Sequence, residues 1–583
     1  MRITCKVFVA AAITLGLLVF NAAATPTISA LNPSPAGAHP VGTTVTWTVA
    51  ASDSDSGALW YRFSVGSHNG TLQVVKDYNI SNTFLWTPTQ NEGGFDIEVS
   101  VENSVTKNVS AAAIQTYTVT SRVTGGTPVI TPTSNSLIAL YSAPPCLVGS
   151  TMRVRFRPST PVYTNDNYDQ STPVEPCNGV TSMNFYIAGM RANTAYIIRH
   201  DLFSGPRVVT GPTLSFSAGA APTPFPSRTV VAPPQLPTSL TNGILLQAVL
   251  NFSAAFATDL NGNVVWYYRF PNPSASQSIT TPLPGGGVLY TSGLPGGGRT
   301  QSYLRATDVA GNTTAETNAA TVDDQLAAMG EPPINGFHHD ARPMPGGGFL
   351  ALAATEKLFT DGTQGSSPTR PVDVLGDVIL VLDKNLHVVW YWSDFDHLNV
   401  NRAALLGETC TASQGGCPQI FLASVANDWT HGNTVELCSD GDILYSARHQ
   451  DFVYKIDYRN GAGTGNLVWT LGNGGDFAMT PNNSNLWFSH QHDPEFQLGG
   501  TTVLSLFDNG NTRIAAHGGN SRGQVLVLDE AHRTVSLQLN VDLGVNSPAL
   551  GAAQRLPNGN YHFDAGEVPA FLGGADSFEF TPS

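Results

Sequence analysis

The stretch "HGNTVELCSDGDILYSARHQDFVYKID", residues 431–457, contains the pattern that decides the fold. A Gly-containing turn is followed by an apolar strand, and a second apolar strand then ends near an aspartate. Short apolar runs separated by turn residues predict antiparallel β-hairpins. The turn-and-strand element occurs six times, as "NGILL" at Asn242, "GGGVLY" at Gly285, "GGGFLAL" at Gly346, "GDILYS" at Gly441, "GGTTVLSL" at Gly499 and "NGNYHF" at Asn558.

A second element alternates with the first and places an aspartate at the end of an apolar strand. The aspartates that keep this phase are Asp259, Asp308, Asp383, Asp457 and Asp529. Two hairpins per repeat make four strands, so six repeats over residues 229–583 predict a six-bladed β-propeller. A row of independent sandwiches is the alternative, but it does not explain the shared phase. The sixth repeat lacks a last strand, and we expect a strand within about residues 229–250 to complete it.

Two further β domains are predicted before the propeller, which makes the whole chain all-β. Residues 25–122 contain short alternating strands such as "TVTWTVAAS" and are typical of an immunoglobulin-like β-sandwich. Residues 123–228 predict a second, fibronectin III-like β-sandwich that ends in a proline-rich linker. Tyr196 stands where such folds place a corner tyrosine that hydrogen-bonds back to the backbone.

The N-terminus predicts a signal peptide over residues 1–24. Arg2 and Lys6 precede an apolar run, and Ala22-Ala23-Ala24 supplies a cleavage site. A membrane anchor is the alternative for this segment. We therefore expect the mature protein to be periplasmic or secreted, with no membrane association after cleavage.

The cysteines fit an exported protein, because disulfides form outside the cytoplasm. Cys146 and Cys177 lie in one predicted domain and are expected to pair. Cys410 and Cys417 bracket a short loop that suits a local disulfide. Cys438 lies on a predicted strand and is expected to be a buried thiol.

Charge argues against nucleic acid as a partner. The chain carries a formal net charge of −15 and has no basic run.

Histidines gather in the propeller region, which holds eleven of the fourteen in the chain. His339, His431 and His492 precede their Gly turns at similar distances, so three consecutive blades present a histidine at the same end of the innermost strand. Arg448 is nearly as far from its turn centre as His431, so the two are expected to be cross-strand neighbours. The four side chains should meet at one mouth of the central channel.

A lone histidine at a strand end is more often structural than functional, but three in matched phase beside an arginine favour a site. Strand alternation should point His449 away from Arg448, so we interpret His449 as structural. His338 and His490 are the alternatives if the register differs by a residue or two.

Arg448 and Asn433 each have a structural role as the alternative. Arg448 could form a buried ion pair with Asp440 or Asp451. Asn433 could simply hold a turn.

Three histidines beside a guanidinium favour an oxyanion ligand. Arginine only donates hydrogen bonds and its charge disfavours a neighbouring metal ion, so we predict no metal and no cofactor. The set suits phosphoryl or sulfuryl transfer to or from an imidazole nucleophile, and no nucleotide-binding P-loop motif is present. A copper or zinc site built from His490, His492 and His431 is the alternative.

The motifs "DWTHGNTVE", "ILYSARHQDFVYKID", "LVWTLGNGGDF", "HQHDPEF" and "LSLFDNGN" occur in this order. Together they resemble the bacterial arylsulfotransferases that work without a nucleotide sulfate donor, and the resemblance covers residues 229–583. It implies an exported six-bladed propeller with one N-terminal β-sandwich and a homodimeric assembly. This chain departs by having two predicted sandwiches, which leaves the dimer open.

The resemblance also implies a role for each candidate residue. His492 would attack the sulfur of an aryl sulfate and form a sulfohistidine, which then passes the sulfuryl group to a phenol. His431 and Asn433 would contact the transferring group and handle the phenol proton. Arg448 would bind the sulfuryl oxygens, and His339 would complete the cradle, with His338 as its alternative. A non-catalytic exported propeller for adhesion or carbohydrate binding is the competing hypothesis.

Overall fold

The computed structural model describes residues 24–167, 169–222, 225–232, 243–249, 252–272, 275–293, 298–412, 414–568 and 574–582. Strands make up 48% and helices 7%, so the predicted all-β class is confirmed. The predicted signal peptide falls almost entirely outside the described residues. Within those ranges, no helix has the length and apolar character needed to cross a membrane.

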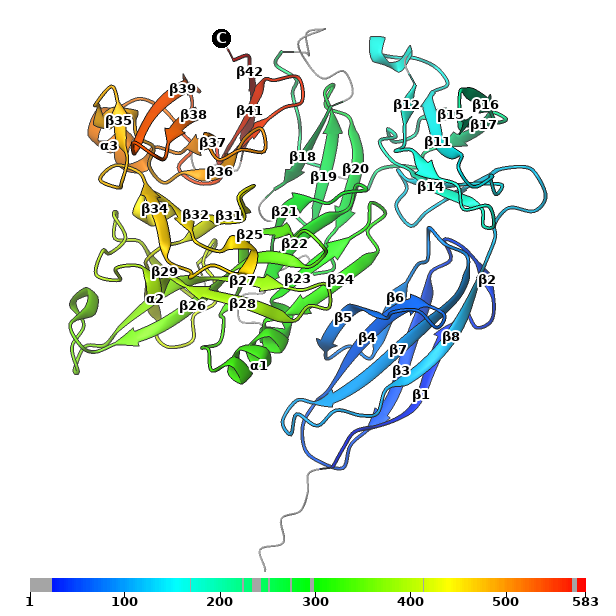
Figure 1. Cartoon of the computed structure of the whole chain (residues 1–583), viewed down its shortest axis with the longest axis horizontal. Helices are drawn as coiled ribbons and strands as arrows, with labels where there is room; N and C mark the ends of the chain where they lie inside the picture. Colours follow the sequence, from blue (N-terminus) through cyan, green and yellow to red (C-terminus); the bar gives the residue numbers. More distant parts are fainter. Residues whose placement is uncertain are drawn as a thin grey trace, which may run out of the picture.

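Residues 27–120 form two sheets that enclose one core, drawn in blue in Figure 1. In the strand Val45–Ser52, Val45, Trp47 and Val49 are buried whereas Thr48 and Ala50 are exposed, because alternate residues face the core and the solvent. Trp47, Phe63 and Val99 are fully buried between the sheets. The strands are β1 (Thr27–Ser34), β3 (Val45–Ser52) and β6 (Thr83–Trp86) in one sheet, and β2 (His39–Pro40), β8 (Ala113–Thr120), β7 (Gly93–Asn103), β4 (Leu59–Ser67) and β5 (Gln73–Asn79) in the other.

Residues 129–217 form a second pair of sheets around their own core. The Tyr196 hydroxyl accepts a hydrogen bond from the Arg191 backbone N–H at 2.8 Å, as the corner-tyrosine interpretation predicts. Cys146 and Cys177 form the expected disulfide. The strands are β9 (Val129–Pro132), β10 (Ala139–Ala143) and β14 (Met183–Ile187), then β11 (Thr151–Pro158), β12 (Gln170–Ser171), β13 (Glu175–Pro176), β15 (Ala195–Ser204), β16 (Arg207–Thr210) and β17 (Leu214–Ser217).

Six mainly antiparallel sheets follow one another in the described part of residues 244–580, from green to red in Figure 1, and the third and the fifth each include one parallel strand pair. The first sheet comprises β18 (Ile244–Ala248), β19 (Ala254–Asp259) and β20 (Val264–Arg269). The second comprises β21 (Ser276–Pro282), β22 (Val288–Gly293), β23 (Tyr303–Thr307) and β24 (Thr313–Asn318). The third comprises β25 (Gly336–Pro343), β26 (Phe349–Phe359), β27 (Val372–Leu382), β28 (Val388–Ser393), β29 (Thr409–Thr411) and β30 (Val425–Asp428). The fourth sheet comprises β31 (Gly432–Leu437), β32 (Ile443–Ala447), β33 (Phe452–Ile456) and β34 (Leu467–Leu471). The fifth comprises β35 (Ala478–Thr480), β36 (His492–Phe496), β37 (Val503–Asp508), β38 (Arg522–Asp529) and β39 (Thr534–Asp542). The sixth comprises β40 (Ala552–Arg555), β41 (Tyr561–Gly566) and β42 (Ala575–Phe580).

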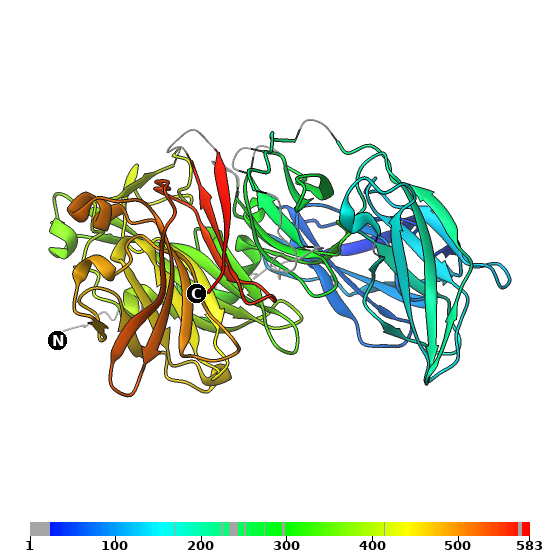
Figure 2. The same cartoon turned by 90° about the horizontal axis from the view of Figure 1, so that it is seen from above.

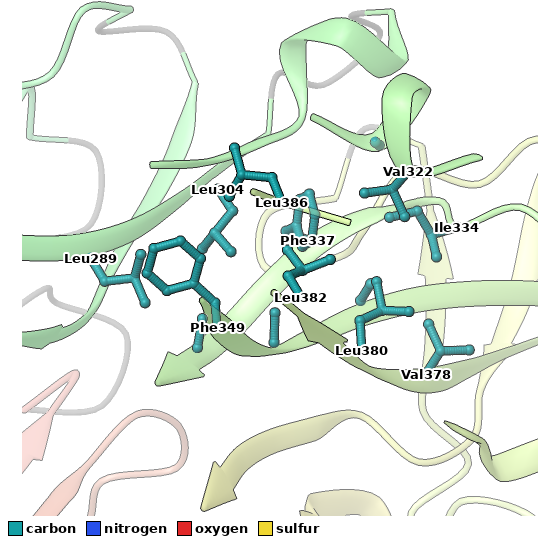
Figure 3. Packing of buried hydrophobic residues seen from close by; sticks show 14 of the residues in the cluster. Leu289, Leu304, Val322, Ile334, Phe337, Phe349, Val378, Leu380, Leu382 and Leu386 are labelled. Atoms are coloured by element: carbon teal, nitrogen blue, oxygen red, sulfur yellow. The ribbon is translucent and has the colours of Figure 1, made fainter. Parts of the chain in front are cut away.

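Hydrophobic cores lie between successive sheets rather than within separate sandwiches. Figure 3 shows one of them, where Leu289 and Leu304 of the second sheet pack with Phe349 and Leu380 of the third. Truncating a fully buried leucine such as Leu380 to alanine costs about 2–5 kcal/mol in such packing. Similar cores join the third sheet to the fourth, the fourth to the fifth and the fifth to the sixth.

The aspartates that recur at the ends of the repeated strands share one structural role. Each carboxylate accepts a backbone N–H within the turn that follows its strand, so it satisfies a donor that the turn leaves unpaired. The pairs are Asp259 with Asn263, Asp308 with Asn312, Asp383 with His387, Asp457 with Thr464 and Asp529 with His532.

The first strands of neighbouring sheets lie side by side, since β21 contacts β25, β25 contacts β31, β31 contacts β36 and β36 contacts β40. Figures 1 and 2 both place the last sheet beside the first. The first and sixth sheets have three strands each in the described residues, where we expected four in the first. β18 pairs with β19 in the first sheet, because a short local hairpin forms there, and so it does not complete the sixth sheet. Residues 233–242 lie outside the described residues, so a closing strand there stays a prediction.

The N-terminal sheets contact the first half of the six-sheet region. The Thr317 hydroxyl donates to Asp77 at 3.1 Å, and the Lys107 ammonium pairs with Asp324 at 2.6 Å. Helix α1 (Ala319–Met329) begins beside this contact. Short helices α2 (Asp394–His397) and α3 (Asn511–His517) lie in the second half.

Candidate active site

The predicted histidines lie where the first strands of three neighbouring sheets are irregular. β25 has a bulge between Phe337 and Ala341, and β31 and β36 have bulges at corresponding places. His339, His431 and His490 adopt φ values of 50°, 49° and 51°. This left-handed conformation costs an ordinary residue on the order of 1–2 kcal/mol, and bulges often redirect side chains at active sites. The local backbone is thus strained in a way that turns these rings out of the regular sheet.

The structure brings the predicted imidazoles together. The ring centroids of His339 and His431 are 4.8 Å apart. The pKa of His492 is lowered first by burial, next by the charge of Arg448 and also by His431, so these groups share one electrostatic environment. His339, His431 and His492 are therefore not scattered.

Each of the three rings is held through Nδ1. Asp428 Oδ2 lies 2.7 Å from Nδ1 of His431, and Asn509 Oδ1 lies 2.6 Å from Nδ1 of His492. Nδ1 of His339 lies 2.8 Å from Nδ1 of His338. Among the described residues, none hydrogen-bonds to Nε2 of these three rings, so all three Nε2 atoms are available to a ligand.

The tautomer of His492 follows from the amide that holds it. The Asn509 Nδ2 group donates to the carbonyl oxygens of Ser547 and Leu550 at 2.8 and 2.7 Å. Oδ1 of Asn509 must then face His492, and a carbonyl oxygen only accepts. His492 therefore carries its hydrogen on Nδ1 and a lone pair on Nε2.

Electrostatics keep His492 uncharged. Burial and the nearby Arg448 guanidinium lower the pKa of His492 to about 3. Burial, followed by the neighbouring His431, also lowers the pKa of His339 well below its usual value. A neutral imidazole with an unoccupied Nε2 is the form that acts as a nucleophile.

Arg448 is buried, with 8% of its surface exposed. One guanidinium nitrogen donates to the Pro548 carbonyl oxygen at 2.8 Å. The alternative ion pair is not formed, because Asp440 pairs with Lys455 at 2.6 Å and Asp451 with His490 at 2.7 Å. In the described ranges no other carboxylate forms an ion pair with Arg448. A buried guanidinium without a counter-ion is suited to binding an anion.

The expected cross-strand pairing of His431 with Arg448 is not formed. The ladder between β31 and β32 ends at Gly432 and Ala447, and residues 448–450 turn into a short 3-10 helix. The ring that stacks on His431 is that of His449, at a centroid distance of 4.5 Å. Strand alternation fails here because the strand has already ended.

His449 and His490 also belong to the cluster, although the sequence indicated a structural role for His449 and predicted His490 only as an alternative. Nδ1 of His449 donates to the Asp428 carbonyl oxygen at 2.8 Å. Each ring nitrogen of His490 lies 2.7 Å from a carboxylate oxygen, one of Asp451 and one of Glu408. Burial lowers the pKa of His490, but these hydrogen bonds outweigh burial and raise it. Glu408 lies on a long connection between two strands, so no local sequence pattern predicts its contact with His490.

Asn433 joins two sheets. Its Nδ2 group donates to the Gln491 carbonyl oxygen at 2.7 Å, and its side chain is 7% exposed. One amide hydrogen of Asn433 is thus engaged in holding β31 beside β36. The turn-holding interpretation is replaced by this link between sheets.

A metal site from His490, His492 and His431 is not formed, because both nitrogens of His490 bind carboxylates. Asp428, His431 and His449 do place one potential ligand atom each within 4.8 Å of one another. Both ring nitrogens concerned already hydrogen-bond to Asp428.

These features define an all-β protein with a buried site in which the neutral imidazoles of His339 and His492 lie near the Arg448 guanidinium. The family model described as arylsulfotransferase (ASST) matches residues 231–579, which is more than half of the chain, and the chain belongs to this family. Membership indicates a sulfotransferase that acts on small molecules. No curated protein matches the chain.

Proposed function

We propose that the protein moves a sulfuryl group from a phenolic sulfate ester to a phenolic acceptor through a sulfohistidine at His492. The observation that carries this proposal is the buried Arg448 guanidinium, without a carboxylate partner, close to a neutral His492 whose Nε2 is unoccupied. Such a pair binds a sulfate ester and attacks it at the same place.

In the first half-reaction, Nε2 of His492 forms a bond to sulfur while the bond between sulfur and the aryl oxygen breaks. The aryloxide leaves with the electron pair. Sulfuryl transfer resembles phosphoryl transfer in having a loose transition state with charge on the peripheral and leaving oxygens. Arg448 neutralises charge on the sulfuryl oxygens.

In the second half-reaction, the acceptor phenol oxygen bonds to sulfur and the bond from sulfur to Nε2 breaks. Nε2 of His431 takes the phenol proton, and Asp428 stabilises the resulting imidazolium through Nδ1. Asn433 and His339 complete the cradle around the transferring group. Removing one fixed donor from such a site costs about 3–4 kcal/mol of transition-state stabilisation.

The architecture that goes with this activity is a six-bladed propeller over residues 229–583. Six successive sheets, cores between neighbours and adjacent first strands support it. We also propose a signal peptide over residues 1–24, an immunoglobulin-like sandwich over 25–122 and a fibronectin III-like sandwich with linker over 123–228. The two disulfides support export to the periplasm or the exterior. A homodimer remains part of the proposal.

The test uses 4-nitrophenyl sulfate with and without phenol and without any nucleotide. We expect phenol-dependent release of nitrophenol and a mass gain of one SO3 group on the peptide that contains His492. His492→Ala should lose both. His532→Ala is the matched control, because His532 is 80% exposed and pairs with Asp529, which is not part of the cluster.

Failure of the folded wild-type protein to release nitrophenol would refute the enzyme. It would leave the competing hypothesis of a non-catalytic exported binding protein.

A further inference from the structure

A buried chain of close polar contacts runs from the site into the protein behind His339. Nδ1 of His339 lies 2.8 Å from Nδ1 of His338, and Nε2 of His338 lies 2.9 Å from Asp377 Oδ1. The Thr430 hydroxyl oxygen lies 2.6 Å from Asp377 Oδ2 and 2.7 Å from Asp394 Oδ2. The chain therefore links β25, β27, α2 and the segment just before β31, and the reaction proposed above uses none of its members except His339.

The two carboxyl groups must share one proton. Thr430 has a single hydroxyl hydrogen and makes two short contacts to carboxyl oxygens, so one contact needs a hydrogen from a carboxyl group. Burial and the charge of Asp377 raise the pKa of Asp394 well above its usual range. Oδ1 of Asp394 has no hydrogen-bond partner in the described residues. The proton thus belongs to Asp394.

Asp377 carries the negative charge. Its Oδ2 accepts hydrogen bonds from the Tyr445 hydroxyl at 2.8 Å and from the Gly432 N–H at 2.6 Å, in addition to Thr430. Although burial acts in the opposite direction, the hydrogen bond and charge of His338 lead the interactions that hold the pKa of Asp377 at about 2. A carboxylate with several donors is the stable form in such surroundings.

The polarity of the chain then determines where His339 keeps its lone pair. A carboxylate has no hydrogen to give and repels a lone pair that lies 2.9 Å away, so the hydrogen of a neutral His338 is on Nε2, which faces Asp377. A neutral His338 consequently accepts at Nδ1, and Nδ1 of His339 donates to it. The second nitrogen of His339, Nε2, is left with the lone pair.

We propose that His338 and Asp377 are positioning residues that fix His339 with its lone pair on Nε2, and that Asp394 holds the single proton of the buried carboxyl pair. Resting on the proposed function, this makes His339 a second acceptor for the phenol proton beside His431. The phenol O–H bond breaks and an N–H bond forms at Nε2. The Nδ1 hydrogen of His339 moves to Nδ1 of His338, whose new positive charge faces Asp377. When the next leaving aryloxide takes the proton from Nε2, the hydrogen on Nδ1 of His338 returns to Nδ1 of His339, and both rings are neutral again.

The first test compares two isosteric changes in the full-length protein, Asp377→Asn and Asp394→Asn. In Asp377→Asn the amide oxygen should face the three donors, so the NH2 group faces His338 and reverses both tautomers. His339 then presents N–H to the site. In Asp394→Asn a neutral amide replaces a neutral carboxylic acid, so the tautomers of His338 and His339 should stay as in the wild type. Because Asp394 is at least as deeply buried as Asp377, this variant controls for the effect of changing a buried residue.

The readout that needs no activity is acylation by diethyl pyrocarbonate at neutral pH, followed peptide by peptide with mass spectrometry. The reagent attacks an imidazole lone pair. Acylation of His339 should fall at least about tenfold in Asp377→Asn and stay within about twofold in Asp394→Asn, as a reversed tautomer requires. The exposed His532 serves as the internal reference for reagent concentration.

The second readout is the turnover of 4-nitrophenyl sulfate. Phenol-dependent kcat should fall about a hundredfold in Asp377→Asn, the usual size of a lost general base, and single-turnover sulfurylation of His492 should fall much less. If Asp377→Asn fails to fold, His338→Gln and His338→Leu replace it. The glutamine amide can accept from His339 and donate to Asp377, so it should retain acylation of His339, whereas leucine should not.

Equal acylation of His339 in Asp377→Asn and wild type, or equal loss in the two asparagine variants, would overturn the relay. A wild-type protein that transfers no sulfuryl group would instead refute the proposed function. The acylation pattern would then decide the relay by itself.

Discussion

Lowering the pH from about 7.5 to about 5 tests whether His492 is the uncharged nucleophile that the structure describes. Burial and the Arg448 charge lower the pKa of His492 from 6.5 to about 3. An imidazole must be neutral to attack sulfur. The rate of the donor half-reaction should therefore report the neutral fraction of this one side chain.

The expected magnitude follows from that pKa. At pH 5 a histidine with a pKa of about 3 is about 99% neutral, whereas one with the ordinary value near 6.5 is about 3% neutral. The two cases differ about thirtyfold in the concentration of nucleophile. We expect the rate of His492 sulfurylation to change less than about twofold over this range.

The assay is a single turnover with excess enzyme over 4-nitrophenyl sulfate and without acceptor, quenched into alkali so that all released nitrophenol is coloured. Thermal unfolding at each pH verifies that the protein stays folded. Arg448→Met is the comparison, because it removes one of the two leading causes of the low pKa. Its rate is lower at every pH, but the informative quantity is the pH at which its profile bends, which should lie above that of the wild type.

A wild-type rate that drops about tenfold per pH unit below pH 6.5 would show an ordinary histidine and contradict the reasoning. An unshifted bend in Arg448→Met would show that Arg448 does not act on His492.

Four other outcomes are expected. Asn509→Ala frees the His492 ring and should lower sulfurylation about ten- to a hundredfold by removing its orientation. Burial is the first cause that lowers the pKa of His449 to about 3. Between about pH 6.5 and 3 the unfolded chain therefore binds more protons than the folded protein, and the free energy of unfolding falls as the pH falls. His449→Phe should reduce the slope of the free energy of unfolding against pH by about 1.4 kcal/mol per pH unit. Cys146→Ser with Cys177→Ser should cost about 2–4 kcal/mol. Chelators should leave turnover unchanged.

Each of these outcomes has its own check. Wild-type sulfurylation in Asn509→Ala would mean that the amide does not orient the ring. Unfolding midpoints between pH 5 and 7 measure the His449 slope, and an unchanged slope would place its pKa in the ordinary range. Denaturant unfolding measures the disulfide. Turnover lost with EDTA and restored by a metal ion would identify a ligand set such as Asp428, His431 and His449.

Sequence periodicity was sufficient for the class of fold and for the approximate place of the site. Repeated Gly turns and phased aspartates are local features, because a turn and its capping carboxylate are set by neighbours along the chain. His339, His431 and His492 share a phase relative to those turns, and that phase alone predicted their convergence.

The register at the ends of the strands could not be predicted. A bulge adds residues to one strand and turns its side chains, and whether it forms depends on the sheets packed against it. The sequence predicts a strand to about Arg448 and an alternating direction for His449, but β32 ends at Ala447, and His431 stacks on His449.

The sequence by itself determined that the protein is all-β, repetitive and equipped with histidines at matching strand ends, since these properties depend on spacing along one chain. Only the tertiary structure decided the partners that set their chemistry. Asn509, Asp428 and Asp377 reach their rings across turns and between sheets, and Glu408 reaches His490 from 82 residues away. Protonation and tautomer depend on distance and burial in space, which spacing in sequence does not measure.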